Sequence, residues 1–211
     1  MVTKINYKKG LSLIELVVAM GIFTMVITIG VGAMLTMFAA NQKSLALRSV
    51  MNNLNFSVES MSREIMVGTN YRCSNDDVNS IGLADCGIGS GGGSQITFCS
   101  SDDKPIAYKF EEVDGKGRIE RRIGKLNDPG GECKQGVAFT WPSPGWQSIT
   151  AIGVDIFVGK SKFYITGTDQ GDTFQPRVLL LIDGEAGKEG QKSDFVIQTT
   201  LSQRTPDLPE Q

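Results

Sequence analysis

The sequence has no histidine among its 211 residues. Serine–histidine and cysteine–histidine nucleophiles are therefore excluded, and no serine lies in a Gly-x-Ser-x-Gly turn. The neighbouring acids Glu111 with Glu112, and Asp102 with Asp103, would point to opposite faces of a strand, because successive side chains alternate. We therefore expect no catalytic residue, no enzyme activity and no cofactor.

Cysteine pairs with Cys-x-x-Cys spacing are also absent. Without that spacing and without histidine, a tightly bound metal is disfavoured, and we expect no metal site. In an oxidising compartment, four cysteines indicate up to two disulfides with three alternative pairings, and the sequence leaves the pairing open. The candidates are Cys73, Cys86, Cys99 and Cys133.

An excess of basic residues is missing too. The formal net charge is −2, and without residues 1–10, which hold three lysines, 18 basic side chains stand against 23 acidic ones. Nucleic-acid binding depends on a basic surface that neutralises phosphates. We therefore expect no nucleic acid contact.

No charged residue occurs from Leu16 to Ala40, a run of 25 residues. As a helix this run would span about 37 Å, enough to cross a bilayer once. A cleaved secretory signal is the alternative, but its apolar core is usually about 7–15 residues long and ends at a small-residue site, which Met37–Asn41 does not offer. The lysines of residues 1–10 predict a cytoplasmic amino terminus, an anchor in the cytoplasmic membrane and a following chain outside the cytoplasm.

Beyond this run, apolar residues recur every three or four positions, as on one face of a helix. They are Leu47, Val50, Leu54, Val58, Met61 and Ile65. We expect one helix of about 85 Å from Leu11 to about Val67, with a membrane half at 11–40 and an amphipathic half at 41–68. Gly68-Thr69-Asn70 predicts its end.

Residues 69–94 are polar and glycine-rich, and we expect an exposed loop held by Cys73 and Cys86. Asn75, Asp77 and Asn79 alternate as at the start of a calcium loop. The glycine and the final acid of such a loop are absent, so weak calcium binding stays an alternative to a solvated loop. Gly87–Gly92 fits a Gly-x-Gly-x-x-Gly pattern but precedes a strand instead of a helix, which argues against a dinucleotide site.

From residue 95 to 204 the apolar period drops to two, which predicts strands. Asp114-Gly115 predicts a hairpin, Gly159-Lys160-Ser161 another turn, and residues 205–211 a loose tail. The fold class expected is α+β, with one long amino-terminal helix packed on an antiparallel β-sheet head. The predicted strands contain Ile106–Phe110, Val137–Trp141, Ile152–Val158 and Phe195–Leu201, together with a central strand, apolar on both faces, at Val178–Ile182.

Glu15 is the single acid near the start of the apolar run. An ionised acid at the centre of a bilayer costs about 2.5–3.5 kcal/mol on insertion scales, and less near the interface. Glu15 therefore either lies close to water or has a cationic partner. A cut after Gly10 would create such a cation, the amine of Leu11, on the same helix or on a neighbouring helix shifted by about one turn.

Residues 8–20, Lys-Lys-Gly-Leu-Ser-Leu-Ile-Glu-Leu-Val-Val-Ala-Met, resemble the class III signal of type IV prepilins and type II secretion pseudopilins. That signal combines a basic leader, a glycine before the cut, a glutamate five residues past it and a long apolar run. The resemblance implies that a membrane prepilin peptidase cuts after Gly10 and methylates Leu11. It also implies that Glu15 neutralises a neighbour's amino terminus and sets axial register.

The same resemblance implies a pilin-like fold and a structural role in a filament. The partners would be the prepilin peptidase, other pilin or pseudopilin subunits, an inner-membrane assembly platform and, before assembly, membrane lipid. Leu11 departs from the commonest phenylalanine, and Gly32 stands where major pilins often have a helix-kinking proline. The mature length and the long β-rich head resemble the J-type or W-type minor subunits of pilus, type II secretion or DNA-uptake machines.

A different class of function remains open on the sequence. The chain could be a single-pass membrane protein whose extracytoplasmic β domain binds a ligand without assembling into a filament.

Overall fold

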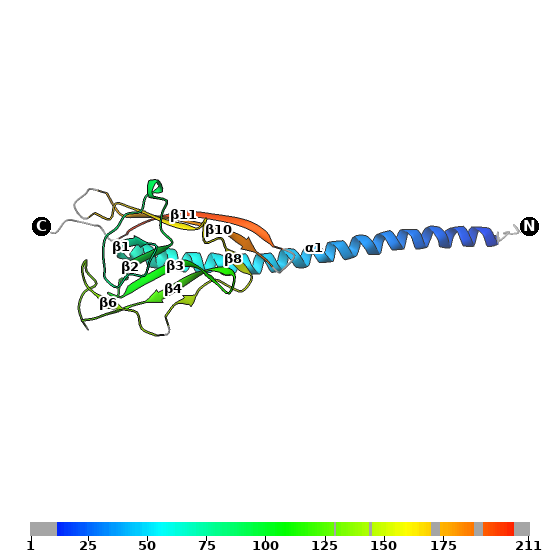
Figure 1. Ribbon diagram of the computed structural model, residues 1–211. Coiled ribbons are helices and arrows are strands. Elements are labelled where there is room, and N and C mark those ends of the chain that lie inside the picture. Colours follow the sequence, from blue (N-terminus) through cyan, green and yellow to red (C-terminus); the bar gives the residue numbers. More distant parts are fainter. Residues whose placement is uncertain (1–11, 129, 144, 170–173, 188–191, 205–211) are drawn as a thin grey trace, which may run out of the picture. The chain divides into compact units, whose positions relative to one another are not determined.

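The computed structural model describes residues 12–128, 130–143, 145–169, 174–187 and 192–204. The chain divides into two compact units, Met1–Leu45 and Ala46–Gln211, and each is considered by itself below. Figure 1 shows the course of the chain through helix α1 and the strands that follow it.

Helix α1 spans Leu13–Val67 without interruption, including at Gly32. It begins after Ser12, whose side-chain oxygen accepts the backbone N–H of Glu15 at 3.3 Å. It ends at Gly68, as predicted, where a side chain would collide with the ring of Phe98. Polar capping at the start and a glycine at the end are the usual boundaries of a helix.

The first unit holds the apolar part of α1. Its large side chains are exposed, from 46% for Ile27 to 84% for Leu13. A stretch of 18 residues in this helix has a mean hydropathy of 2.3, and none of it is buried. Among the described residues α1 is the one helix long and apolar enough to cross a membrane. An exposed surface of this kind is suited to lipid or to other apolar helices.

The second unit contains the amphipathic part of α1, and the predicted face is the buried one. Leu54, Val58, Met61 and Ile65 are 0–9% exposed, while Leu47 and Val50 are half-buried. They pack in one core with side chains of the strands. The sequence prediction of an α+β fold with a helix packed on antiparallel strands is therefore confirmed.

One sheet has five antiparallel strands in the order β1-β2-β3-β4-β7. The predicted hairpin at Asp114-Gly115 is present, and both residues have positive φ, as a two-residue β-turn requires. The strands are β1 (Thr69–Ser74), β2 (Gln95–Cys99), β3 (Pro105–Val113), β4 (Lys116–Ile123) and β7 (Gln147–Ser148).

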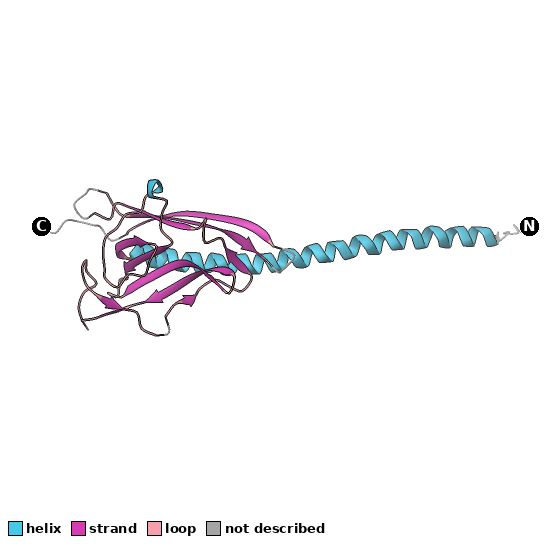
Figure 2. Ribbon diagram, in the orientation of Figure 1, coloured by secondary structure: helices cyan, strands magenta, loops and turns pink. Residues whose placement is uncertain are grey.

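A second sheet is built around β10 (Arg177–Ala186), which pairs antiparallel with β11 (Ser193–Ser202) on one edge. Its other edge pairs with both β8 (Val154–Ile156) and β9 (Lys162–Thr166). The prediction of a central strand at residues 178–182 is thus confirmed. A small antiparallel pair is formed by β5 (Lys125–Leu126) and β6 (Phe139–Thr140), and η1 (Ile88–Ser90) is a short 3-10 turn. Figure 2 shows that the part of the chain after α1 consists mainly of strands and loops.

The two larger sheets meet where β4 crosses β8. Gly117 has no room for a side chain, because a Cβ there would strike the carbonyl oxygen of Ile156. Its backbone N–H instead donates to Asp155 Oδ1 at 2.8 Å. Glycine is therefore required at this point by close backbone approach, and the polar bond holds the two sheets together.

Three segments differ from the pattern predicted by alternation. The loop expected at 69–94 begins as strand β1, whose single fully buried residue, Tyr71, gave no alternating apolar signal. The expected strand at Val137–Trp141 is reduced to β6, and that at Ile152–Val158 to β8. Ile152 lies in a turn and is 100% exposed, because the chain reverses at Gly153 with φ 98°.

Candidate functional site

The amino-terminal segment places its first described residue, Ser12, at the start of α1. Gly10 and Leu11 lie outside the described residues, so the predicted cut and methylation positions stay predictions. Ser12 was missed in the sequence as a helix cap. The pattern Ser-Leu-Ile-Glu, a serine followed three residues later by a glutamate, is the signal that could have identified it.

Glu15 lies in the first turn of α1 and is exposed. From residue 12 to residue 42 no other side chain is charged, so the described part of this unit offers no side-chain cation close to Glu15 in the chain. Its carboxylate is surrounded along the helix by exposed apolar residues such as Leu16 and Val18. An acid in such surroundings needs either water or a cation from outside this segment.

In the second unit, Glu64 connects the amphipathic half of α1 to the five-stranded sheet. Arg121 on β4 donates to it twice, from Nη2 to Oε1 at 2.8 Å and from Nε to Oε2 at 3.1 Å. Tyr108 on β3 donates its hydroxyl to Glu64 Oε2 at 2.7 Å. This three-residue network, which we call the helix–sheet clamp, fixes the rotation of the helix on the sheet, since bidentate contacts are geometrically specific.

Burial, followed by the hydrogen bond to Glu64, raises the pKa of Tyr108 well above its usual value. The phenol therefore stays protonated and remains a donor to the carboxylate at any ordinary pH. The side chains of Arg121 and Glu64 are 25% and 31% exposed, so the pair is only partly removed from solvent. The clamp acts in packing and orientation, and no catalytic role is indicated.

All four cysteines are paired. Cys73 bonds to Cys86, and Cys99 bonds to Cys133, which answers the pairing that the sequence left open. The first disulfide holds the ends of the segment between β1 and η1, as the loop prediction supposed. The second links the end of β2 to a segment 34 residues further on.

The second disulfide should contribute more to stability than the first. It closes a loop of 34 residues against 13, so the chain-entropy relation gives about 3.8 against 2.9 kcal/mol. Two double variants test this ranking, one with alanine at both Cys99 and Cys133 and one with alanine at both Cys73 and Cys86. Each is unfolded with urea as the full chain in detergent. A larger loss of unfolding free energy in the variant without the Cys73–Cys86 disulfide would contradict this ranking.

The outer face of the five-stranded sheet carries charged and polar residues under two tryptophans. The guanidinium of Arg122 lies 3.8 Å from the ring centre of Trp141 and 4.1 Å from that of Trp146. Arg122 also donates to Asp77 Oδ1 at 2.8 Å. These contacts anchor the loop around residue 77 on the sheet, and stacking on aromatic rings stabilises a cation that is 7% exposed.

The three residues considered for calcium lie in different surroundings and do not form one site. Asn75 Oδ1 accepts the backbone N–H of Ser94, Asp77 pairs with Arg122, and Asn79 lines a pocket described below. Within the described residues no group of three or more histidines, cysteines, aspartates or glutamates could hold a metal ion. The segment Gly87–Gly92 forms the η1 turn, and not the strand-to-helix junction of a dinucleotide site.

A comparison with protein families matches residues 5–37 to the prokaryotic N-terminal methylation motif. No curated protein and no solved structure matches the chain. The matched segment contains the predicted cut position, Glu15 and most of the exposed apolar part of α1. Residues 5–37 are therefore similar to the prokaryotic N-terminal methylation motif, in the segment where the sequence resembles a prepilin signal.

Proposed function

We propose that this chain is a filament subunit, cut after Gly10, N-methylated at Leu11 and assembled through the apolar part of α1. The observation that carries the proposal is the methylation motif at residues 5–37, on a helix whose apolar side chains are exposed. Such a surface must meet lipid before assembly and neighbouring helices afterwards, because in water its exposure would be unfavourable. The prepilin peptidase, an assembly platform in the inner membrane and other pilin or pseudopilin subunits are the partners this requires.

Glu15 has a defined task in this proposal. Removal of residues 1–10 creates an amine at Leu11, four positions before Glu15. In the apolar interior of a filament, an ion pair between this amine and Glu15 of a neighbour shifted by about one turn compensates two charges at once. The pair forms at one axial offset between subunits, so it sets their register.

The orientation follows from charge and chemistry. The lysines of the leader keep the amino terminus in the cytoplasm, and the second unit lies outside it, where its two disulfides are stable. The length of the chain and the head with two larger sheets support a minor subunit of the J or W type. The structural role requires no cofactor and no enzymatic activity.

The deciding measurement is the mass of the amino-terminal peptide of protein taken from cells that have a prepilin peptidase. Filament processing predicts loss of Met1–Gly10 and the gain of one methyl group on Leu11. Retention of Met1–Gly10 would contradict the proposal and favour the single-pass membrane protein with a ligand-binding β domain. Gly10→Val is the matched control, and it should leave the full-length chain in the membrane.

A further inference from the structure

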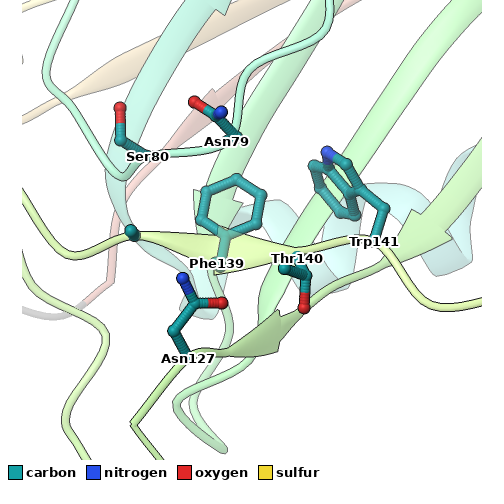
Figure 3. A pocket seen from close by; sticks show the side chains of 7 residues that line it. Asn79, Ser80, Asn127, Phe139, Thr140 and Trp141 are labelled. Atoms are coloured by element: carbon teal, nitrogen blue, oxygen red, sulfur yellow. The ribbon is translucent and has the colours of Figure 1, made fainter.

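A surface pocket of about 460 Å³ lies beside the small β5–β6 pair, away from the helix–sheet clamp. Its volume falls within the range of about 300–1,000 Å³ that is usual for small-molecule sites. Figure 3 shows its walls: Asn79 and Ser80 on one side, Asn127 and Thr140 on another, with the rings of Phe139 and Trp141 between them.

Backbone hydrogen bonds fix the three segments that form these walls. Asn79 accepts the N–H of Phe139 at 2.9 Å, and Asn127 donates its N–H to Ala138 at 3.2 Å. Trp141 donates Nε1–H to the carbonyl of Val78 at 2.8 Å, which sets the plane of its ring. The backbone of the walls and the Trp141 ring are therefore pre-formed, and a ligand would have to order only the polar side chains.

The side chains on these fixed walls have unused hydrogen-bonding groups. No described residue makes a hydrogen bond to the side-chain amides of Asn79 or Asn127, or to the hydroxyl of Ser80. Each amide provides two donors and an acceptor, and the hydroxyl provides both. These groups come from separate segments and border the same pocket, whereas exposed amides elsewhere, such as Gln198 on β11, do not line it.

The composition of the pocket identifies a class of ligand. None of its lining residues is charged, so it has no group to pair with an anion or a cation. It combines an aromatic surface with amides and hydroxyls, which suits a molecule with apolar C–H faces and a rim of hydroxyl groups. We propose that this pocket, between Asn79, Asn127 and Trp141, binds a neutral saccharide.

In such a complex the sugar ring lies against the accessible part of the Trp141 ring, since Phe139 is only 1% exposed. The sugar hydroxyls exchange hydrogen bonds with Asn79, Asn127 and Ser80. The inference does not depend on cleavage or filament assembly, since every residue it uses lies in the second unit. It would give the head a means of attaching to glycan-bearing surfaces.

Intrinsic fluorescence can test this proposal, because the chain has two tryptophans and Trp141 lines the pocket. In a Trp146→Phe background Trp141 is the single reporter. The full chain, purified in a detergent without a sugar headgroup, is titrated with cellobiose, lactose and diacetylchitobiose up to about 50 mM. A saturable change with at least one disaccharide is expected, and no saturable change with any of the three would overturn the proposal.

Variants locate the binding. Asn79→Ala and Asn127→Ala remove exposed side chains without a described partner, so the fold is retained and affinity should fall by about tenfold each. Gln198→Ala removes an exposed amide from β11 and is the matched control with unchanged affinity. Equal titration curves for the parent and both asparagine variants would place the binding elsewhere and refute the site.

Discussion

Replacement of Glu15 by alanine should leave cleavage after Gly10 intact and lower incorporation into filaments by about 10–100-fold. Ion pairs removed from solvent at an interface contribute roughly 1.5 kcal/mol or more, and each 1.4 kcal/mol is a factor of ten in the association constant. Glu15 contributes its backbone N–H to the Ser12 cap, and alanine retains that bond. The start of the helix is therefore preserved, and the loss falls on assembly.

Two further substitutions separate charge from size. Glu15→Gln keeps nearly the same shape without the charge and should behave as Glu15→Ala does. Glu15→Asp keeps the charge on a shorter side chain and should recover part of the assembly. Amino-terminal mass reports cleavage, and the amount of subunit in sheared filaments reports incorporation. Normal incorporation of the Glu15→Ala variant into filaments would contradict the proposed ion pair.

Helix α1 could be predicted because its signals are local. The spacing of Leu54, Val58, Met61 and Ile65 places them on one face, and all four are buried in the structure. The absence of charge over the apolar part and the glycine at position 68 are likewise visible in consecutive residues. Burial of a helical face depends on its period, and the period can be counted from sequence.

The helix–sheet clamp could not be predicted from the sequence. The hairpin at Asp114-Gly115 fixes the register of β3 and β4, so it already places Tyr108 opposite Arg121. The sequence does not show which turn of α1 faces this pair, because Glu64 lies 44 residues from Tyr108 and 57 residues from Arg121. Contacts of that range depend on how sheet and helix are packed, and no local pattern records them.

The pocket proposed to bind a saccharide could not be predicted from the sequence for a related reason. Its walls come from residues 79–80, 127 and 138–141, and β6, which lies within the last of these segments, is only two residues long. A strand so short has no measurable alternation, and polar residues such as Asn79 and Asn127 read as ordinary loop residues. They are brought together by two backbone hydrogen bonds, from the N–H of Phe139 to the carbonyl of Asn79 and from the N–H of Asn127 to the carbonyl of Ala138.

Replacement of Glu64 by alanine should lower the free energy of unfolding of the full chain by about 2–3 kcal/mol. The substitution removes the acceptor of Tyr108 and both bonds from Arg121. Arg121 is then left partly buried without its carboxylate, although its remaining exposure lets water replace some of the loss. Urea unfolding in detergent, followed by the circular dichroism of the head, measures the change.

Glu59 provides a matched control on the same helix. It pairs with Arg63 at 2.8 Å, but both side chains are about two-thirds exposed. Exposed pairs at this helical spacing contribute about 0.3–0.5 kcal/mol, so Glu59→Ala should cost no more than that. Equal losses from Glu59→Ala and Glu64→Ala would mean that the helix–sheet clamp adds nothing beyond a surface ion pair.

A double-mutant cycle with Arg121→Ala isolates the interaction itself. If Glu64 and Arg121 stabilise the fold through each other, the double variant should be more stable than the sum of the single losses predicts, by about 1–2 kcal/mol. Removing both also leaves Tyr108 without the polar partners it has in the clamp, so some loss should remain in the double variant. Strict additivity would show that Glu64 and Arg121 add no stability through each other, which would leave the apolar face of the helix and the bond from Tyr108 to hold the helix on the sheet.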